Sequence, residues 1–288
     1  MLPIIELSRY SPGMITAMGV SMGLTAGAIQ RRGTIAQKEK YVPDLLTMDT
    51  IGAWAITEPG SGSDAFGSMR ASAVRDGNGN YVLNGNKTFI TNGPYADVIV
   101  FICKLDEGNP PEERKVLSFV LDSGMPGLEQ TPPLRKMGLH SSPTGMLFLD
   151  GVRAGTDRLL GESLDAYGGS AGREASKATF ALERSGVAAM ALGIIERCLE
   201  LCVPYAKERV QFGQPIGNYQ LIQLKLAKME VARHNVAINN MLPGPFATDR
   251  LLNTSRAVAD VSGSSGVRRI ISSVSRCSNQ PRSRPPRP

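Results

Sequence analysis

The chain has 288 residues, of which 42% are hydrophobic, so it can bury a sizeable core of two or three packed layers. Its four cysteines show no CxxC spacing and it has only two histidines, which argues against a disulfide framework and against a His-rich metal site. The net charge of +6 lies entirely in residues 240–288, because the preceding residues carry equal numbers of basic and acidic side chains.

Residues 1–50 are predicted to be helical. Residues 13–29 carry no charge, but they are fewer than the roughly 20 apolar residues that a membrane span needs. The residues before them contain an acid, Glu6, and make a poor signal peptide. We therefore expect a packed helix and no membrane role. Within residues 34–46, Pro43 is expected to interrupt a second helical stretch.

Residues 51–160 change to short strands and tight turns. The segments IGAWAIT, DVIVFICKL, KVLSFVLD and GMLFLDGV have the length and composition of strands. Asn84-Gly85 lies between two apolar pieces and is a hairpin signal, and DGNGN at 76–80 is another turn. Several strands without intervening helices favour an antiparallel barrel or sandwich.

Residues 161–239 return to a helical period. Glu183, Val187, Met190 and Ile194 lie on one stripe of a first helix, which Pro204 is expected to kink or end. The segment YQLIQLKLAKMEVARHNV predicts a second helix after a short link. Residues 240–288 hold eight Arg, nine Ser and six Pro with one aromatic residue, which predicts disorder. The expected fold is thus α+β: a remnant of a helical domain, a β-barrel domain, a partial helical bundle and a disordered tail.

The segment GSGSDA at 60–65 matches the spacing of a dinucleotide-binding turn, but no helix is predicted to follow it. A Rossmann site is therefore not expected. An ordinary loop, or a loop whose backbone N–H groups hold a phosphate, remain the two interpretations.

Glu183 also has two interpretations. A carboxylate on an apolar stripe is a candidate general base, because burial raises the pKa of a carboxyl while the neighbouring Arg184 opposes that rise. The alternative is an acid in the first turn of a helix, stabilised by the helix dipole. The residue types and their spacing leave both interpretations of Glu183 open.

Five separated motifs resemble the acyl-CoA dehydrogenase family, in the family's order. They are GTIAQKEKYVPDLL, AWAITEPGSGSD, YVLNGNKTFITNG, MGLHSSPTGMLFLDGVR and YAKERVQFGQPIGNYQLIQLKLAKM. The resemblance implies an N-terminal helical domain, a middle β-barrel and a C-terminal helical bundle. It also implies FAD-dependent oxidation of an acyl-CoA thioester to the trans-2-enoyl-CoA, with electrons passed to an electron-transferring flavoprotein. A homo-oligomer, dimer or tetramer, is implied, in the cytoplasm of a bacterium or the mitochondrial matrix.

The resemblance assigns residues to this site. Glu183 matches the base of the isovaleryl-CoA and long-chain branches, which carry it in an LER segment. Substrate contacts are implied for Ser63, Leu182 and Arg184. FAD contacts are implied for Trp54, Ile56, Thr57, Gly62, Ser63, Phe89, Ile90 and Thr91, and, across a subunit contact, for Arg209, Phe212, Tyr219 and Gln220.

The resemblance ends near Val236, where relatives continue with further helices. We therefore expect a C-terminally incomplete family member that holds FAD poorly and self-associates. The alternative function is that of a catalytically inactive homologue that acts as a binding protein, on nucleic acid through the basic tail.

Overall fold

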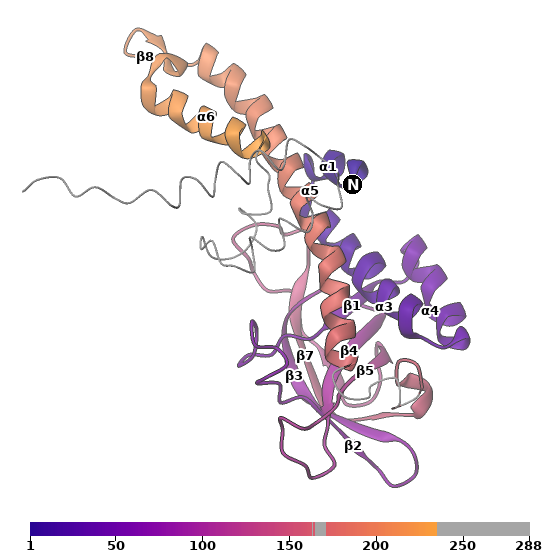
Figure 1. Cartoon of the computed structure of the whole chain (residues 1–288). Helices are drawn as coiled ribbons and strands as arrows, with labels where there is room; N and C mark the ends of the chain where they lie inside the picture. Colours follow the sequence, from indigo (N-terminus) through magenta and orange to yellow (C-terminus); the bar gives the residue numbers. More distant parts are fainter. Residues whose placement is uncertain (163, 165–170, 235–288) are drawn as a thin grey trace, which may run out of the picture. The chain divides into compact units, whose positions relative to one another are not determined.

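A computed structural model of the chain describes residues 1–162, 164 and 171–234, with the backbone alone for 171–182 (Figure 1). Residues Met1–Met229 form one compact unit, and a second unit, Glu230–Pro288, is described only for the end of the last helix. The predicted disordered tail, 240–288, and Val236 lie outside the described residues. The helices that begin the chain are α1 (Leu2–Ser8), α2 (Pro12–Met18), the π-helix η1 (Gly19–Thr25), α3 (Ala26–Arg32) and α4 (Ile35–Thr47).

The segments α2, η1 and α3 follow one another without a break, so the helix predicted for residues 13–29 is confirmed. Their 21 residues, Pro12–Arg32, are long and apolar enough to cross a membrane by length and composition. Half of the most apolar window is buried inside the structure, however, and η1 packs against the first strand of the sheet. This is the behaviour of a core helix in a globular protein.

Helix α4 begins with a capping box, in which Thr34 and Gln37 satisfy each other's free backbone N–H groups. The Gln37 amide also donates to the carbonyls of Asp157 and Leu159, at 2.7 and 2.9 Å. The predicted interruption at Pro43 is wrong, because α4 continues through it to Thr47. Buried side chains on both sides of the proline, including Leu45, hold the helix against its neighbours.

A seven-stranded sheet follows. Its strand order is β1-β4-β2-β3-β7-β6, and β5 pairs with β4. The strands are β1 (Gly52–Ala55), β2 (Ser72–Arg75), β3 (Tyr81–Thr91), β4 (Val98–Leu105), β5 (Val116–Asp122), β6 (Leu128–Gln130) and β7 (Thr144–Ala154), followed by the short 3-10 helix η2 (Thr156–Arg158).

The predicted antiparallel barrel is wrong in its topology. Strands β1 and β2 both run parallel to β4, so the sheet is mixed, and among the described residues no pairing closes it from β1 to β6. Parallel neighbours need a long crossover connection, which is usually a helix. Here the chain crosses from β1 to β4 through the β2–β3 hairpin instead of through a helix. The β1–β4 and β2–β4 pairs are therefore parallel although no helix separates these strands in the sequence.

The hairpin predicted at Asn84-Gly85 is also wrong, because β3 runs straight through both residues. Gly85 has a φ of 147°, and the register with β7 shifts between Leu83 and Gly85, so the glycine marks a β-bulge. A Cβ on Gly85 would lie 2.6 Å from the Cβ of Ala71. The second predicted turn, at 76–80, is the β2–β3 connection, where Asp76 N–H donates to the Asn80 carbonyl at 3.0 Å.

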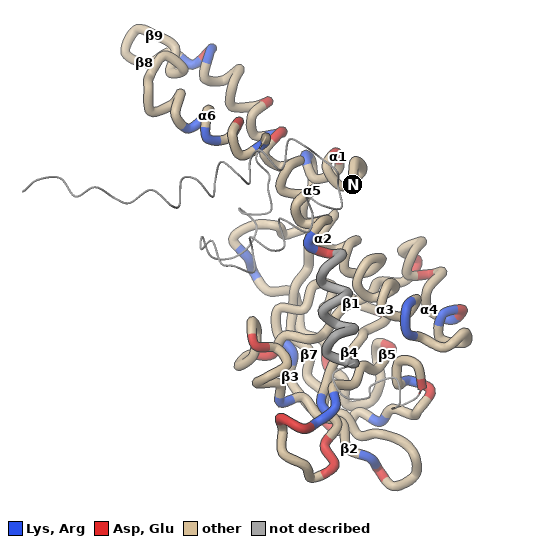
Figure 2. Tube along the Cα trace, in the orientation of Figure 1, with Lys and Arg blue, Asp and Glu red and all other residues tan. Residues whose placement is uncertain are grey.

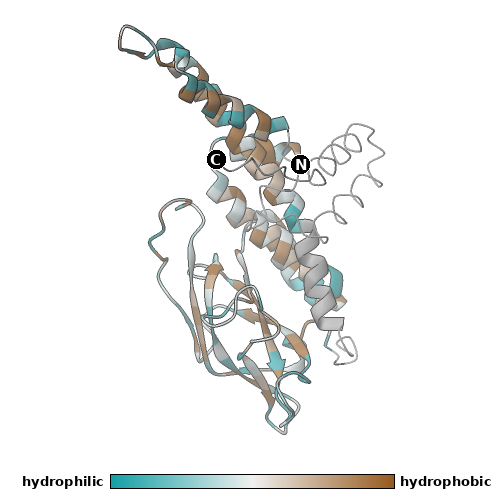
Figure 3. Ribbon diagram, turned by 60° about the vertical axis from the view of Figure 1, so that its left-hand side comes forward, coloured by the Kyte–Doolittle hydropathy of each residue, from teal (hydrophilic) through white to brown (hydrophobic). Residues whose placement is uncertain are grey.

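The core lies between the strands and the N-terminal helices. Every residue of β4 is buried, and Phe101 of β4 faces a fully buried Phe119 of β5. Figure 3 shows hydrophobic residues on the strands of the sheet and on the helices, and Figure 2 shows charged residues on α4, on the loops around β2 and β3, and along α5 and α6. Two charged residues are exceptions to the apolar core, because Lys87 of β3 and Lys104 of β4 are buried.

Helix α5 (Ala171–Glu208) contains Pro204. Of the two outcomes predicted at this proline, an end of the helix is wrong, and a kink stays a prediction. The helix packs closely on α1: a Cβ on Gly193 would meet the Ile5 carbonyl oxygen at 2.1 Å. Arg9, the C-cap residue of α1, forms ion pairs with Glu196 and Glu200 of α5. The chain continues through β8 (Val210–Gln211), β9 (Gln214–Pro215), the 3-10 helix η4 (Ile216–Asn218) and α6 (Gln220–His234).

Candidate active site

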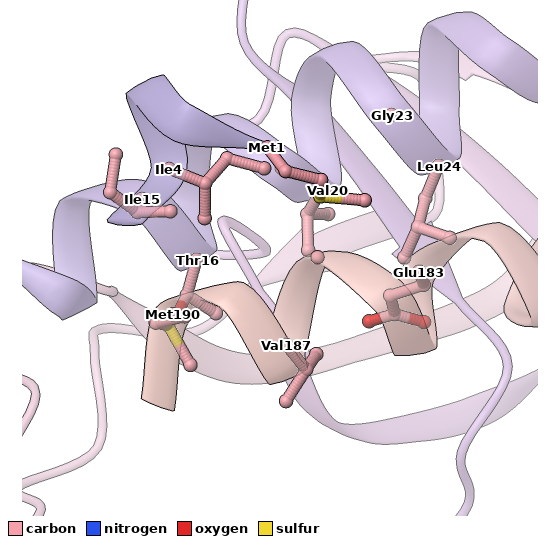
Figure 4. Close-up of a pocket in the computed structure, with 12 residues that line it drawn as sticks. Met1, Ile4, Ile15, Thr16, Val20, Gly23, Leu24, Glu183, Val187 and Met190 are labelled. Carbon is pink, nitrogen blue, oxygen red and sulfur yellow. The ribbon is translucent and has the colours of Figure 1, made fainter. Parts of the chain in front are cut away.

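A pocket of about 310 Å³ lies between the N-terminal helices and α5. Nearly all of its lining is apolar, and among the residues whose side chains the structure describes, Glu183 is the one with an ionisable side chain that lines it. Figure 4 shows the Glu183 carboxylate between α5 and η1, next to Leu24 and one turn from Val187. The lining residues are Met1, Ile4, Ile15, Thr16, Gly19, Val20, Gly23, Leu24, Glu183, Gly186, Val187 and Met190.

Glu183 lies twelve residues after Ala171, the first residue of α5. It is therefore more than three turns inside the helix, and its interpretation as a first-turn acid is wrong. The side chain is half-buried, and this burial raises the pKa of its carboxyl, while the charge of Arg184 acts in the opposite direction. Arg184 itself is exposed. Of the predicted stripe, Glu183, Val187 and Met190 line the pocket, whereas Ile194 is not among the lining residues.

Two glycines open the pocket on the side of η1. Around Gly19 and Gly23, no atom lies within 4 Å of the position that a Cβ would take. Both face the pocket one helical turn apart, so a ligand can approach the backbone of η1 there. A π-helix is rare, and such segments are frequent at functional sites.

Asn92 ties the pocket-lining helices to the sheet. Its side-chain amide donates to the carbonyls of Ala17 in α2 and Gly52 in β1, both at 2.9 Å. The Gly52 N–H in turn donates to the Ser21 hydroxyl of η1 at 2.9 Å. Asn92 is buried and has a φ of 64°, a conformation that asparagine tolerates better than most residues.

The predicted FAD contacts of β1 and β3 form a second group. The Thr88 N–H donates to the Thr57 carbonyl at 2.9 Å and so joins the two segments. Trp54, Ile56 and Ile90 are buried, whereas Thr57 and Thr91 are half-buried. Phe89 is 68% exposed and has a φ of 56°, in a register shift of β3. An exposed aromatic ring held in a strained backbone is a candidate ligand contact.

The β1–β2 loop (residues 56–71) carries Gly62 and Ser63, which are both exposed. No atom lies within 4 Å of a Cβ built on Gly60 or Gly62, so their backbone is open to a ligand. No helix follows the GSGSDA segment before β2, as the sequence indicates. The loop is anchored by a buried ion pair between Glu58 and Lys87, 2.9 Å apart, which our sequence analysis missed. Both residues stand inside the quoted motifs, but their pairing depends on strands that are far apart in the chain.

The third group of predicted contacts lies at the connection from α5 to α6. Arg209 and Gln220 are exposed, and Phe212 is 93% exposed with a φ of 50°. The rings of Phe212 and Tyr219 meet edge to face at 6.4 Å, and the Tyr219 hydroxyl donates to the Gln211 carbonyl at 2.8 Å. The connection packs on α5. The side chain of Leu182 lies outside the described residues.

The chain is similar to known proteins over most of its length. Three profiles of one family match the chain: "Acyl-CoA dehydrogenase, N-terminal domain" over residues 1–49, "middle domain" over 53–152 and "C-terminal domain" over 170–241. A short-chain specific acyl-CoA dehydrogenase of Megasphaera elsdenii is 36% identical over 90% of this chain and 67% of its own. A mitochondrial isovaleryl-CoA dehydrogenase of Pongo abelii is 38% identical over 78% of this chain and 51% of its own.

Solved structures show the same fold. The butyryl-CoA dehydrogenase of Megasphaera elsdenii superposes with a TM-score of 0.72 at 36% identity, over 90% of this chain and 67% of that one. An acyl-CoA dehydrogenase from Bacillus anthracis complexed with FAD gives a TM-score of 0.71 at 33% identity, over 82% and 38%. The chain spans about half to two thirds of the length of the two curated relatives. It belongs to the acyl-CoA dehydrogenase family.

Proposed function

We propose that this protein carries out the FAD-dependent dehydrogenation of an acyl-CoA thioester to the trans-2-enoyl-CoA, with Glu183 as the base. The observation that carries the proposal is the half-buried carboxylate of Glu183, which has a raised pKa and faces a mostly apolar pocket. A general base works best when its pKa lies near the working pH, and burial moves a carboxyl in that direction.

We assign the binding of the acyl group and the removal of its proton to the residues of the pocket. Its Cα–H bond breaks, Glu183 takes the proton, and a double bond forms between Cα and Cβ as the β-hydride leaves. When bound, FAD supplies the acceptor for that hydride, which no side chain can provide. The apolar lining from Ile4, Val20 and Val187 holds the acyl chain and excludes water from the carboxylate.

The residues of the second group fit a flavin. Trp54, Ile56 and Ile90 supply a buried apolar wall, and the exposed Phe89 ring and the half-buried Thr57 and Thr91 lie at its edge. The open backbone at Gly62 and Ser63 can donate N–H groups to a phosphate. We assign Ser63, Leu182 and Arg184 to the substrate, and Arg209, Phe212, Tyr219 and Gln220 to FAD bound by a neighbouring copy.

The remaining assignments rest on the family. The electron acceptor is an electron-transferring flavoprotein, and the working form is a homo-oligomer in a bacterial cytoplasm or the mitochondrial matrix. The division at residues 50, 160 and 239 into helical, β and bundle domains is also part of this proposal.

Flavin bleaching tests the function. The purified chain is loaded with FAD and mixed, without oxygen, with short, branched and long acyl-CoAs while flavin absorbance is followed. We expect bleaching by at least one thioester and none by free CoA. A chain that retains flavin but is bleached by no member of the panel would refute the proposal, and the rank order within the panel defines the acyl class.

A further inference from the structure

Two buried lysines hold the β1–β2 loop. Lys87 of β3 is fully buried, and its ammonium donates to the Ile56 carbonyl at 3.0 Å and to the Glu58 carboxylate at 2.9 Å. Lys104 of β4, which is 4% exposed, donates to the Gly67 carbonyl at 3.2 Å. Charged side chains are almost never buried unless they are paired, so both positions demand an explanation.

The Glu58 carboxylate closes the loop on itself. One oxygen accepts the Ala71 N–H at 2.9 Å as well as the Lys87 ammonium, and the other accepts the Arg70 N–H at 2.7 Å. The start and the end of the loop are therefore joined at a single carboxylate, which is anchored to β3. The exposed Gly62 and Ser63 lie between the two joined ends.

Glu58 is the carboxylate that balances the positive charge of Lys87. The nearby thiol of Cys103 is fully buried, and this burial raises its pKa to about 12, so it stays neutral. The Lys87 ammonium also lies 5.3 Å from the centre of the Phe101 ring. Burial lowers the pKa of Lys87, and the Glu58 carboxylate opposes that shift.

A buried ion pair adds little net stability, since apolar residues of similar shape often do as well. Its contribution here is geometrical: it holds a long loop in one conformation. Loops of this length without secondary structure are uncommon and are usually functional.

We infer that Lys87 and Glu58 are positioning residues for FAD, which hold the β1–β2 loop so that the backbone at Gly62 and Ser63 is presented to the cofactor. This inference rests on the proposed function for its ligand, although the anchoring of the loop does not. The Thr88 N–H bond to Thr57 lies next to Lys87, so the same anchor sets the position of Thr57.

The test compares full-length Lys87→Met, the double variant Lys87→Met/Glu58→Gln, and Arg75→Met. The last variant removes the exposed ion pair of Arg75, in β2, with Glu107, which follows β4, and it is the matched control. The dissociation constant for FAD is measured by titration, thermal stability by circular dichroism, and loop order by trypsin cleavage after Arg70. The bond after Arg70 carries the Ala71 N–H that Glu58 holds, so its cleavage reports the anchor directly.

We expect Lys87→Met to raise the dissociation constant for FAD and the cleavage rate after Arg70 by about tenfold or more, and Arg75→Met to change neither. The double variant leaves no buried charge unpaired, so its thermal stability should be higher than that of Lys87→Met. Its affinity for FAD and its protection from trypsin cleavage after Arg70 should stay as low as in Lys87→Met. Recovery of affinity and protection together with stability, or wild-type values in Lys87→Met, would overturn the inference. If the wild-type chain bound no FAD, the proposed function would fail, and the cleavage rates would still decide whether Lys87 anchors the loop.

Discussion

Glu183 is the residue on which the proposed chemistry depends. Replacing it with glutamine keeps its shape and removes the proton acceptor. We expect Glu183→Gln to retain FAD and acyl-CoA binding while the rate of flavin bleaching falls by about 10²–10⁴-fold. Stopped-flow absorbance measures this, with Glu196→Gln on the same helix as the control. Bleaching of Glu183→Gln at the wild-type rate would remove Glu183 from the mechanism.

The raised pKa of Glu183 predicts two opposite pH effects. The base acts when it is deprotonated, so the bleaching rate should rise with pH through this pKa. Stability should change in the other direction: a carboxyl with a folded pKa above its unfolded value binds more protons when folded, so stability falls as pH rises between the two values. Glu183→Gln should therefore melt higher than wild type at pH 7, with no difference at pH below the unfolded pKa. A neutral-pH melting temperature below that of wild type would contradict this.

Gly19 and Gly23 set the width of the pocket. Gly19→Val or Gly23→Val places methyl groups in space that is open in the structure. We expect discrimination against long or branched acyl-CoAs to increase by about tenfold or more relative to the shortest active thioester. Bleaching rates across the substrate panel measure this. Gly27→Val, on the same helical stretch but outside the pocket, is the control. An unchanged rank order would show that the acyl chain does not pass η1.

At the scale of elements, Asn92, which directly follows β3, joins it to α2 and β1 through one partly buried and one buried hydrogen bond. Asn92→Ala leaves two carbonyls without this donor, and we expect the free energy of unfolding to fall by about 1–3 kcal/mol. Asn92→Gly tolerates the positive φ but loses the same bonds, so it separates backbone strain from hydrogen bonding. Urea denaturation measures both variants. Wild-type stability of Asn92→Gly would mean that the side-chain bonds contribute nothing.

At the scale of the whole molecule, large apolar side chains are exposed along α5, along α6 and in the connection between them. They include Leu201, Tyr205, Phe212, Leu221 and Leu224. Covering each of them contributes roughly 1.5–3 kcal/mol, so we expect the chain to self-associate. Light scattering after size exclusion measures this. The variant Leu221→Glu/Leu224→Glu should shift the chain toward a monomer, and a wild-type chain that is monomeric at every concentration would refute the prediction.

The sequence by itself determined the elements and the family. Strands β4, β5 and β7 and helix α6 lie where their composition and period predict, since these patterns depend on neighbours in the chain. The five ordered motifs identify the family for the same reason. The stripe of Glu183, Val187 and Met190 follows from helical periodicity, which places the three side chains on one face.

Only the tertiary structure decided which of these residues meet. The parallel pairs of β4, the bulge at Gly85 and the ion pair of Lys87 with Glu58 all join segments that lie far apart in the chain. The start of α5 at Ala171 excluded the first-turn interpretation of Glu183, and the N-terminal helices made its surroundings apolar. Local sequence sets the period of a segment, but burial and the pKa of a carboxyl depend on what packs against it, which is a property of the folded chain.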